Sequence, residues 1–518
     1  MTEKEKRNET KRKKAMRKLL FVLLCLMLLS PQQGVAQRAY TNLVIFVRFA
    51  DDAPIERSLA EIDSFFNAQT AGAYSIANYY AAFSYGQMAI NTRFANQQDA
   101  DGHIVAYTDS YPRGYFMPYS ASNPDGYTDE VPLMGIHERE KALLARIVAF
   151  VDENQLVASD VSLDGDGDGD IDNVSFIVKG GVGAWASILW PHMEYYRNWN
   201  GGAEAYINGK RLNCFNMEFE GGGQYFRPEV FCHELGHSLG LPDVYHYINY
   251  PYVSPAGHWD LMCEGGRVHT PAINKYKYLG LTDPPQEITS NGTYTLMSVG
   301  SSSSQNCYFI RSAIDPTQWY VLEYRYREDP FETDLPESGL LVARWNDTTD
   351  ITNLYAGNCF FDYYQQAHSY WLFRPGSACD TVQGRLGQAF FSQQSGRNRF
   401  DATTDPHPHL TDGTLESSFA IHDITTDGTR CSFSVTFNLT GFNGINKDGS
   451  LRCHPNPVTD RLSVDVGEQA VPVSLYDPMG RLLLTVTAHG SATIDMTPFA
   501  TGVYILKTNG KTQKIIKQ

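Results

Sequence analysis

The apolar positions of this chain follow two different patterns along its length. Residues 43–47, Leu-Val-Ile-Phe-Val, form a continuous apolar run, which predicts a buried strand near the start of the folded region. Between about residues 60 and 160, helical patterns alternate with loops rich in Gly, Pro, Asn and Asp. Residues 138–151 predict an amphipathic core helix, because one helical face carries Leu143, Leu144, Ile147, Val148 and Val151.

After about residue 285, short alternating strands follow one another, separated by Asn-Gly, Asp-Gly and Ser-rich turns. This pattern is typical of β-sandwich modules, so we expect a domain boundary there. A Gly- and Asn-rich segment at 441–449 marks a second boundary. The 518 residues therefore predict an α+β protein with a mixed unit at 37–285, a β-sandwich-like domain at 286–440 and a small β-sandwich at 449–518.

The first 36 residues predict a secretory signal peptide. Residues 4–18 are crowded with Lys and Arg, residues 19–29 are all apolar, and Gly34-Val35-Ala36 offers small residues for cleavage. A membrane anchor is the alternative, but eleven residues span only about 16 Å as a helix and a bilayer core needs about 30 Å. Translation starts at Met1 or at Met16, and the mature chain is expected to begin near Gln37 without a membrane-spanning segment.

Charge and cysteine content narrow the choice of partners and compartment. The formal net charge of −16 becomes −22 without the first 36 residues, which hold nine basic and three acidic side chains. Such a field repels phosphate backbones and anionic lipids, so nucleic acid is not expected as a partner. Cys25 leaves with the signal peptide, and the remaining eight cysteines permit disulfides in an exported protein without indicating their pairing.

Residues His233-Glu234-Leu235-Gly236-His237 form an H-E-x-x-H motif. On a helix, for which Pro228 is a suitable first residue, the two histidines lie one turn apart on one face. Both imidazoles can then bind one zinc ion, with Glu234 in reach of water on the metal. A structural zinc site or a buried histidine pair is the alternative, but a closed structural site needs a fourth protein ligand and has no use for Glu234.

The residues after the motif indicate a third ligand. Ser238-Leu239-Gly240-Leu241-Pro242-Asp243 extends the pattern to H-E-x-x-H-x-x-G-x-x-D. Gly240 can end the helix in the left-handed conformation and Pro242 prevents its resumption, so the chain can turn back and present Asp243. His246 and Glu264 are the competing third ligands. Further on, Trp259-Asp260-Leu261-Met262 stands at the distance expected of a Met-turn, whose methionine lies beneath the metal.

These residues predict peptide-bond hydrolysis. Zinc lowers the pKa of its bound water to about 7, Glu234 takes the proton as general base, and the hydroxide attacks a peptide carbonyl that the metal polarises. Glu234 then passes the proton to the leaving amine. The group that stabilises the oxyanion is open: Tyr245, Tyr247, Tyr250 and Tyr252 are candidates by proximity, and a solvated tyrosine-rich loop is an equal alternative.

Taken together, residues 40–350 resemble a metzincin-type zinc peptidase of the immune inhibitor A family. The resembling segments are 43–51, Tyr79-Tyr80, Ser84-Tyr85-Gly86, 164–172, Trp190-Pro191-His192, the zinc motif, 259–262, 320–324 and 339–342. The resemblance implies a zincin/metzincin-like catalytic domain at 37–285, in which a twisted sheet carries the active-site helix. It also implies secreted endopeptidase activity with zinc on His233, His237 and Asp243. One departure is that Cys263 and Glu264 stand where astacin-like and serralysin-like members place a tyrosine.

An acidic loop precedes the segment 174–178, which reads as a strand. Its carboxylates stand at positions 1, 3, 5, 7 and 9 of an EF-hand-like pattern, from Asp164, Asp166, Asp168, Asp170 and Asp172. The twelfth position is Ser175, so the usual bidentate ligand is missing. We expect a structural calcium ion, because so many clustered carboxylates repel one another without a cation; a surface turn rich in Asp and Gly is the alternative.

Residues 449–518 resemble the carboxy-terminal sorting domain of the type IX secretion system. The resemblance rests on Pro455-Asn456-Pro457, Tyr476-Asp477-Pro478-Met479-Gly480 and Gly502-Val503-Tyr504-Ile505-Leu506, with Lys511, Lys514 and Lys517 at the end. It implies a Gram-negative bacterium, the type IX secretion machinery as a partner, and removal of this domain at the cell surface. Without the resemblance, alternation at Leu462, Val464 and Val466 would indicate a generic β-sandwich binding module.

The leading hypothesis is therefore a secreted or surface-attached zinc endopeptidase that acts on proteins or peptides. The second hypothesis is a surface adhesin or glycan-binding protein on a catalytically inactive protease scaffold, which the many β-strands and aromatic residues would suit. An intact Glu234 argues against it, because an inactive scaffold has no use for the general base.

Overall fold

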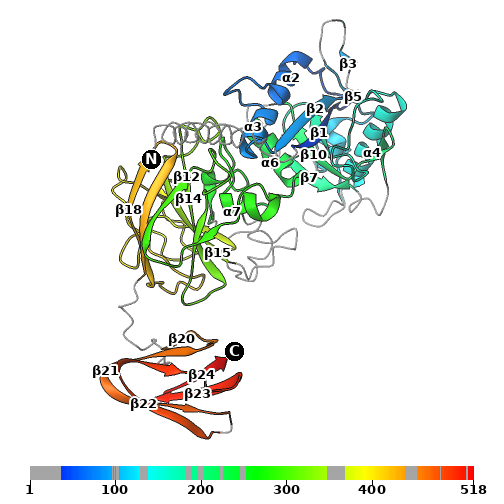
Figure 1. The fold of residues 1–518 in the computed structure, drawn as a ribbon. Coiled ribbons are helices and arrows are strands. Elements are labelled where there is room, and N and C mark those ends of the chain that lie inside the picture. Colours follow the sequence, from blue (N-terminus) through cyan, green and yellow to red (C-terminus); the bar gives the residue numbers. More distant parts are fainter. Residues whose placement is uncertain are drawn as a thin grey trace, which may run out of the picture. The chain divides into compact units, whose positions relative to one another are not determined.

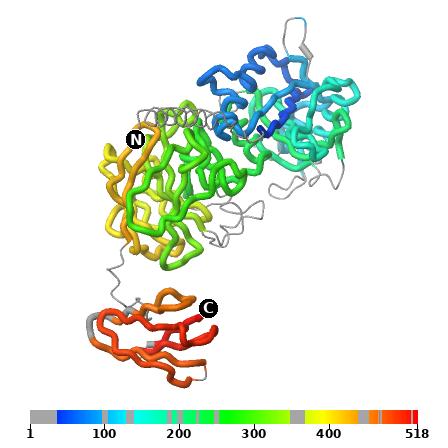
Figure 2. Tube along the Cα trace, in the orientation of Figure 1, coloured from blue at the N-terminus to red at the C-terminus, as the bar shows by residue number. Residues whose placement is uncertain are grey.

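The structure is a computed structural model, and it describes most of the chain downstream of the predicted signal peptide. The described residues are 37–95, 97–98, 100, 104–128, 138–182, 190–196, 204–221, 226–245, 253–346, 368–437, 452–478, 480–508 and 511–518. Residues 1–36 and the predicted signal peptide lie outside them. The chain divides into two compact units, residues 1–435 and 436–518, which are described separately (Figure 1; Figure 2 gives the same trace as a tube).

The first part of unit one is built on a six-stranded sheet with the order β2-β1-β6-β10-β7 and with β5 beside β1. The strands β1, β2, β5, β6 and β10 run parallel, and β7 is antiparallel to β10. Their bounds are β1 Arg38–Arg48, β2 Met88–Phe94, β5 Tyr107–Thr108, β6 Asn173–Val178, β7 His192–Tyr195 and β10 Cys214–Phe219. Two short hairpins pair β3 Gln97–Gln98 with β4 Ile104–Val105, and β8 Tyr206–Ile207 with β9 Lys210–Arg211.

Helices cover both faces of this sheet, because the side chains of β1 alternate between two cores. Leu43 and Ile45 pack with α4 (Glu138–Glu153), whose predicted apolar face is buried. Val44 and Phe46 face the opposite core with α2 (Leu59–Asn67), α3 (Ile76–Phe83) and α6 (Pro228–Ser238). A capping box of Ser58 and Glu61 begins α2. This second core therefore lies directly beneath the helix that carries the H-E-x-x-H motif.

The remainder of unit one is mainly β-structure. One six-stranded sheet has the order β11-β13-β14-β15-β16 with β17 beside β15, and a three-stranded sheet has the order β12-β19-β18. The bounds are β11 Gln286–Glu287, β12 Gly292–Met297, β13 Tyr308–Arg311, β14 Gln318–Arg325, β15 Gly339–Asn346, β16 Tyr370–Leu372, β17 Phe390–Phe391, β18 Phe419–Asp427 and β19 Arg430–Phe437. Short helical turns are η1 Arg113–Phe116, η2 Gly257–Trp259, α7 Ala272–Asn274, η3 Lys275–Leu279 and η5 Leu386–Gln388.

One hydrophobic core passes through the boundary that the sequence predicts near residue 285. The cluster that contains Leu235 of α6 and Met262 also contains Val321, Leu341 and Trp345 of the β-rich part. Residues on both sides of position 285 thus fold as one compact unit. The mixed α+β character is confirmed, and the domain boundaries at 285 and 440 stay predictions.

A buried arginine joins the two parts of this unit. Arg325 at the end of β14 is fully buried and donates hydrogen bonds to the carbonyl oxygens of Trp259 and His269, at 2.6 and 2.9 Å. Its guanidinium also pairs with Glu332, at 2.7 Å, and with Glu323, at 3.3 Å. The β-rich part therefore holds the backbone on both sides of Met262.

The second unit is a five-stranded sheet with a separate core. Its order is β20-β21-β23-β24 with β22 beside β21, and all its pairings are antiparallel. The bounds are β20 Arg452–His454, β21 Arg461–Tyr476, β22 Leu482–Asp495, β23 Gly502–Thr508 and β24 Lys511–Lys517. Leu462 and Val464 are fully buried and Val466 packs against the core, as the alternation predicts.

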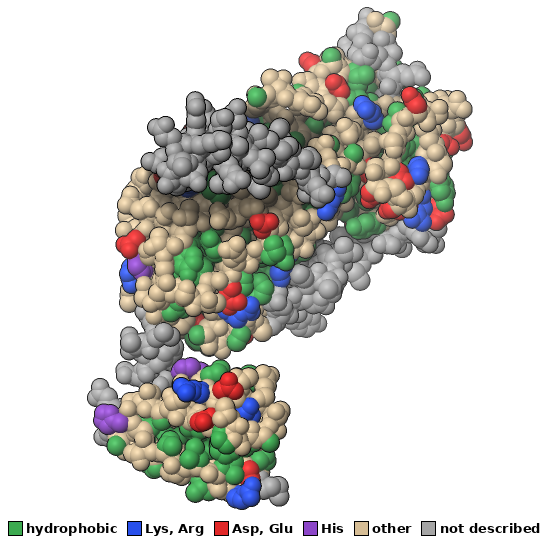
Figure 3. All heavy atoms as spheres, viewed as in Figure 1, with side chains coloured by type: hydrophobic (Ala, Val, Ile, Leu, Met, Phe, Trp, Pro, Cys, Tyr) green, Lys and Arg blue, Asp and Glu red, His purple; other side chains and the backbone are tan. Residues whose placement is uncertain are grey.

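Three expectations from the sequence concern membrane-spanning segments, disulfides and surface charge. Among the described residues, no helix is both long and apolar enough to cross a membrane. None of the seven described cysteines forms a disulfide, and Cys359 lies outside the described residues. On the face drawn in Figure 3, Lys and Arg side chains lie beside Asp and Glu rather than in a large basic patch.

The Arg325 network predicts a large loss of stability on substitution. Arg325→Met keeps much of the apolar stem but leaves the buried Glu332 carboxylate without its cation and two carbonyls without their donor. Removing one partner of a buried ion pair costs about 3–5 kcal/mol, which urea denaturation should show for the first unit. Arg311→Met is the matched control, because Arg311 forms an exposed pair with Glu287 and should cost under about 1 kcal/mol. Equal losses in the two variants would contradict this role for Arg325.

Candidate active site

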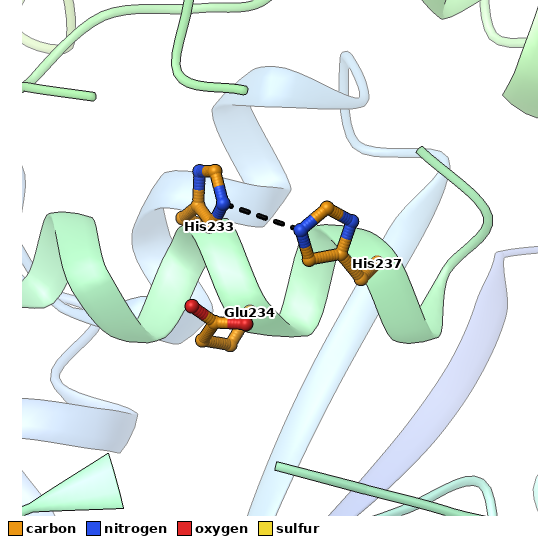
Figure 4. A group of neighbouring side chains, drawn as sticks. All are labelled: His233, Glu234 and His237. Atoms are coloured by element: carbon orange, nitrogen blue, oxygen red, sulfur yellow. Dashed lines mark hydrogen bonds between the residues drawn. The ribbon is translucent and has the colours of Figure 1, made fainter. Parts of the chain in front are cut away.

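Helix α6 carries the two histidines of the motif. Arg227 is its N-cap residue and Pro228 its first helical residue, as the sequence predicts. His237 follows His233 by four positions, and their ring centroids lie 4.8 Å apart with the ring planes perpendicular. Figure 4 shows both imidazoles on one side of the helix, and their Nε2 atoms lie 3.2 Å apart.

The helix ends in a turn that brings Asp243 back to the histidines. Gly240 adopts a left-handed φ of 108°. Its N–H donates to the carbonyl of His237 and the N–H of Leu241 donates to the carbonyl of Gly236, both at 2.9 Å. These two bonds are the Schellman pattern, which closes the last turn and reverses the chain. The Asp243 side chain is consequently buried against the two imidazoles.

Three potential ligand atoms form a nearly equilateral triangle. Asp243 Oδ1 lies 3.1 Å from His233 Nε2 and 3.3 Å from His237 Nε2, and the two nitrogens are 3.2 Å apart. Ligands of a tetrahedral zinc ion with bonds of about 2.0–2.1 Å stand about 3.3 Å from one another. The donor set of His233, His237 and Asp243 therefore fits a zinc ion with its fourth position open.

Backbone carbonyls orient both imidazoles. His233 Nδ1 donates to the carbonyl oxygen of Leu261, and His237 Nδ1 donates to that of Leu241, both at 2.8 Å. With the proton on Nδ1, the Nε2 lone pair of each ring is available to a metal. Neither acceptor could be named from the sequence, because a backbone carbonyl has no residue-type signature.

Met262 packs directly beneath the histidine pair. A Cβ atom on Gly236 would lie 3.0 Å from Met262 Sδ, so the glycine lets the methionine approach the helix between His233 and His237. The carbonyl of Met262 also accepts from the N–H of Val244, next to Asp243, at 2.8 Å. The segment predicted as a Met-turn is thus bonded to both the helix and the third-ligand segment.

A polar layer between the sheet and α6 was missed by sequence reasoning. Asn216 of β10 donates to the carbonyl of Glu234 at 3.0 Å and to Ser238 Oγ at 3.1 Å. Asn173 of β6 donates to Asn216 Oδ1 at 2.6 Å and accepts from Ser238 Oγ at 2.8 Å. Because these side chains come from two strands and a helix, only the folded chain brings them together. They fix the position of α6 on the sheet.

Glu218 is a second missed residue, on the same face of β10 as Asn216. Its side chain is fully buried, and neither carboxylate oxygen has a hydrogen-bond partner among the described residues. Burial and the charge of Glu234 raise the pKa of Glu218 well above its usual range, which favours the protonated carboxyl. The available signal in the sequence was an acidic residue within the run Cys214–Phe219. In the structure, every position of this run is buried.

Glu234 lies beside the two histidines and lines a cleft. One of its carboxylate oxygens lies within 4.8 Å of a ligand nitrogen of each histidine. The cleft has a volume of about 620 Å³, and its lining includes His233, Glu234 and Tyr245. A peptide could therefore reach Glu234 and the ligand triangle from solvent.

The competing candidates have different outcomes. Glu264 lines the cleft and pairs with His258 at 3.4 Å, so the structure does not bring it into the ligand triangle. His246, Tyr247, Tyr250 and Tyr252 lie outside the described residues. Tyr245 is described, and its ring stacks on His233 with centroids 6.5 Å apart.

The acidic loop has positive partners of its own. The structure brings together Asp164, Asp166 and Asp172, which each offer an oxygen within 4.8 Å of the others. Asp164 accepts from Lys210 Nζ at 2.6 Å, and this bond lowers the pKa of its carboxyl. Asp170 instead forms two hydrogen bonds with Arg211, at 2.7 and 2.8 Å, and Asp168 is likewise not in the group of three. Lys210 and Arg211 therefore provide positive charge of the kind that a calcium ion was expected to provide. A calcium ion is not supported.

Comparisons with known proteins bear on both resemblances. Residues 161–279 match the immune inhibitor A peptidase M6 catalytic domain, and residues 452–518 match the secretion system C-terminal sorting domain. A search of curated proteins gave no match. Among solved structures, the chain is similar to PorZ, an essential surface component of the type-IX secretion system of Porphyromonas gingivalis, at 12% identity over 41% of this chain and 39% of that chain. The TM-score is 0.13, and the chain spans well under half the length of that protein.

The two family matches confirm the resemblances read from the sequence, over narrower ranges than 40–350 and 449–518. Residues 161–279 are therefore similar to a metallopeptidase catalytic domain, which suggests a bound metal, and residues 452–518 to a type IX sorting tail. The tail indicates a secreted or cell-surface protein of Bacteroidetes-type bacteria that interacts with the secretion machinery. All three candidate zinc ligands, Glu234 and Met262 lie inside the matched segment.

Burial of Glu218 predicts a pH-dependent cost that an amide removes. Because its pKa in the folded chain is raised, the folded state holds a proton that the unfolded chain releases above about pH 4.5. Stability should therefore fall as the pH rises from there toward the raised value. Glu218→Gln has no such proton, so its advantage in unfolding free energy should grow by up to about 1.4 kcal/mol per pH unit. Urea denaturation from pH 5 to 8 tests this against the exposed control Glu337→Gln; parallel curves for Glu218→Gln and wild type would refute it.

Proposed function

We propose that this protein is a secreted, zinc-dependent endopeptidase that hydrolyses peptide bonds in proteins or peptides. The observation that carries the proposal is the triangle of His233, His237 and Asp243 beside Glu234, at the wall of an open cleft. The match to a peptidase catalytic domain supports it independently.

His233, His237 and Asp243 would hold the zinc ion. When bound, zinc would polarise a substrate carbonyl and lower the pKa of a water molecule. Glu234 is the general base: its carboxylate accepts a proton from water and afterwards donates it to the leaving amine. Asn216 and Ser238 keep α6, and with it Glu234, in position.

The fold proposal is a zincin/metzincin-like catalytic domain followed by β-sandwich domains. Support for the first part is that the sheet, the active-site helix, the reversing turn and the segment around Met262 surround one centre. Support for the second part is the two β-sheets of residues 286–437 and the five-stranded sheet of the tail. In this proposal the domains are 37–285, 286–440 and 449–518.

Export is proposed to use both ends of the chain. Residues 1–36 would direct the precursor across the inner membrane as a cleaved signal peptide. The sorting tail would then direct the protein to the type IX machinery and be removed at the surface. Its separate hydrophobic core supports a role as a detachable address, since cleavage before it leaves the core of unit one intact.

The alternative function, an adhesin or glycan-binding protein on an inactive scaffold, is not favoured. An inactive scaffold has no need for a general base, yet Glu234 lies beside a complete ligand triangle.

Substitution of the general base should separate chemistry from metal binding. We expect the mature full-length chain to contain one zinc ion and to cleave casein or gelatin in a chelator-sensitive manner. Glu234→Gln should retain the zinc and lose at least about 100-fold in activity, because only the proton acceptor is removed. Elemental analysis and a proteolysis assay on the same preparations test both statements. Zinc in neither protein, or equal cleavage by both, would sink the proposal.

The identity of the third ligand predicts a contrast between two carboxylates. Asp243→Ala should lower the zinc content sharply, because it removes one of three protein ligands. Glu264→Gln should retain zinc, since Glu264 pairs with His258 rather than with the two imidazoles. Equilibrium dialysis against a zinc buffer measures both affinities. A stronger loss for Glu264→Gln than for Asp243→Ala would assign the third ligand to Glu264 instead.

A further inference from the structure

Two stretches of chain supply most of the lining of the cleft. One is α6 with its N-cap Arg227, and the other is segment 257–266, which we call the cleft wall. The lining residues of the cleft wall are His258, Cys263, Glu264, Gly265 and Gly266. Apart from the three-residue η2, this segment contains no helix or strand, so its position depends on contacts with neighbouring elements.

A buried arginine of the β-rich part bonds to the chain just before the cleft wall. Arg374 follows β16, is fully buried, and donates to the carbonyl oxygens of Ser254 at 2.8 Å and of Pro255 at 3.1 Å. It also donates to the carbonyls of Leu372 at 2.9 Å and Gln383 at 2.8 Å. One guanidinium therefore joins the end of β16 to the two residues from which the wall continues, through charge-assisted hydrogen bonds.

Gln383 makes a second connection at the same place. Its side-chain Oε1 accepts from the N–H of Ser254 at 2.7 Å, across 129 positions of the chain. The N–H of Leu372 donates to the carbonyl of Pro255 at 3.0 Å. Both backbone groups of Ser254 are thus bonded to the segment 372–383, which restrains the chain in position and in direction.

The position of Ser254 is passed on to the lining residues. Ser254 Oγ accepts from the N–H of Gly257 at 3.0 Å and lies 3.4 Å from Cys263 Sγ. The same N–H also donates to Cys263 Sγ, at 3.2 Å, and the N–H of Glu264 donates to the carbonyl of Gly257 at 3.3 Å. A shift of Ser254 would therefore disturb Cys263 and Glu264 together.

Leu386 supports the cleft wall from the same side. Trp259 Nε1 donates to the carbonyl of Leu386 at 2.9 Å. Gly257 has a φ of 57°, and a Cβ atom there would clash with the Leu386 side chain. The cleft wall thus packs closely on residues 372–386, which belong to the β-rich part.

From these contacts we infer that Arg374 and Gln383 are positioning residues for substrate binding. They hold the cleft wall at the distance from α6 that a bound peptide requires, so the β-rich part completes the peptide-binding cleft. A preorganised wall lowers the cost of ordering when a peptide binds. The link to substrate rests on the proposed peptidase function, whereas the restraint on the wall can be measured without it.

A matched pair of glutamine variants tests the kinetic consequence. Gln383→Ala removes the acceptor of the Ser254 N–H. Gln318→Ala is the control, because Gln318 Oε1 accepts from the N–H of Thr411 at 3.0 Å and lies outside the cleft lining. On a peptide that the wild type cleaves, Gln383→Ala should raise KM by about three- to tenfold, the effect of one lost hydrogen bond. Its kcat and zinc content should stay unchanged, because the lost interaction is made equally in ground and transition states. Gln318→Ala should leave KM unchanged.

The arginine gives a graded version of the same test. Arg374→Met should raise KM by about tenfold or more, and Arg374→Lys should recover part of the loss because it keeps a cationic donor. Arg344→Met is the control for loss of a buried arginine, since Arg344 is fully buried but bonds to Asp380 and His409. It should lower the unfolding free energy without raising KM. If Arg374→Met does not fold, the glutamine pair decides.

The reactivity of Cys263 measures the restraint without any peptidase activity. Burial raises the pKa of the Cys263 thiol to about 12, so the thiol is unreactive while the wall is in place. Alkylation of the native mature chain with iodoacetamide, followed by mass spectrometry of the peptide that contains Cys263, reports opening of the wall. Gln383→Ala should speed this labelling by about fivefold, as expected for an opening equilibrium that loses one hydrogen bond. Gln318→Ala should not.

The outcomes separate this inference from the proposed function. If the wild type cleaves peptides but Gln383→Ala changes neither KM nor labelling, or changes them no more than Gln318→Ala does, the inference is wrong and the peptidase stands. If the wild type cleaves no peptide but Gln383→Ala alone speeds labelling of Cys263, the proposed catalysis fails and the restraint on the cleft wall stands.

Discussion

The centre depends on the chain reversal at the end of α6. A helix continued through Leu241 would carry residue 243 about 9 Å beyond His237 along the axis, out of reach of a shared ligand. The two hydrogen bonds around Gly240 close the helix and return Asp243 to the imidazoles. Gly240 accommodates the positive φ that this requires, and a Cβ there would be strained by the backbone rather than by any neighbouring atom. One local conformation therefore determines whether two or three candidate metal ligands come together.

The two histidines of α6 are held in place by groups that are distant in sequence, some on the sheet beneath the helix and some in the β-rich part. From below, the polar layer of Asn216 and Asn173 fixes α6 on the sheet. From the side, Arg325 bonds to the carbonyl of Trp259, and Leu261 in turn accepts from His233. The β-rich part thus helps to orient His233, a candidate metal ligand, through the segment that contains Met262. A shared hydrophobic core across residue 285 also joins the two parts, which belong to one compact unit.

Charge is distributed differently at the candidate active site and in the acidic loop. At the candidate active site, the carboxylates of Asp243 and Glu234 lie beside the two imidazoles, where they would match the charge of a divalent ion. The acidic loop follows the opposite course, because Lys210 and Arg211 of β9 neutralise Asp164 and Asp170. Acidic residues that look alike in the sequence thus differ in how far their charge is neutralised. The difference depends on whether the fold places a cationic side chain beside them.

Local rules account for what the sequence by itself determined. The spacing of His233 and His237, the start of α6 at Pro228, the turn at Gly240, the strand through residues 43–47 and the apolar face of α4 each depend on neighbours within a few positions, and all are confirmed. The approach of Asp243 to the two imidazoles also followed from the sequence, because Asp243 is only six residues from His237. The sorting tail was identifiable because its motifs are contiguous.

Tertiary structure alone decided the rest, because the groups concerned are far apart in the chain. The carbonyl acceptor of His233 is 28 residues away, the arginine that holds Trp259 is 66 residues away, and Lys210 stands 46 residues from the aspartate it neutralises. The calcium expectation failed to gain support for this reason, since a count of carboxylates does not include the cation brought by a distant strand. Glu218 likewise acquires its raised pKa only by burial beneath α6, and Asp334 becomes part of the cleft lining only in the folded chain. No spacing along the sequence encodes either.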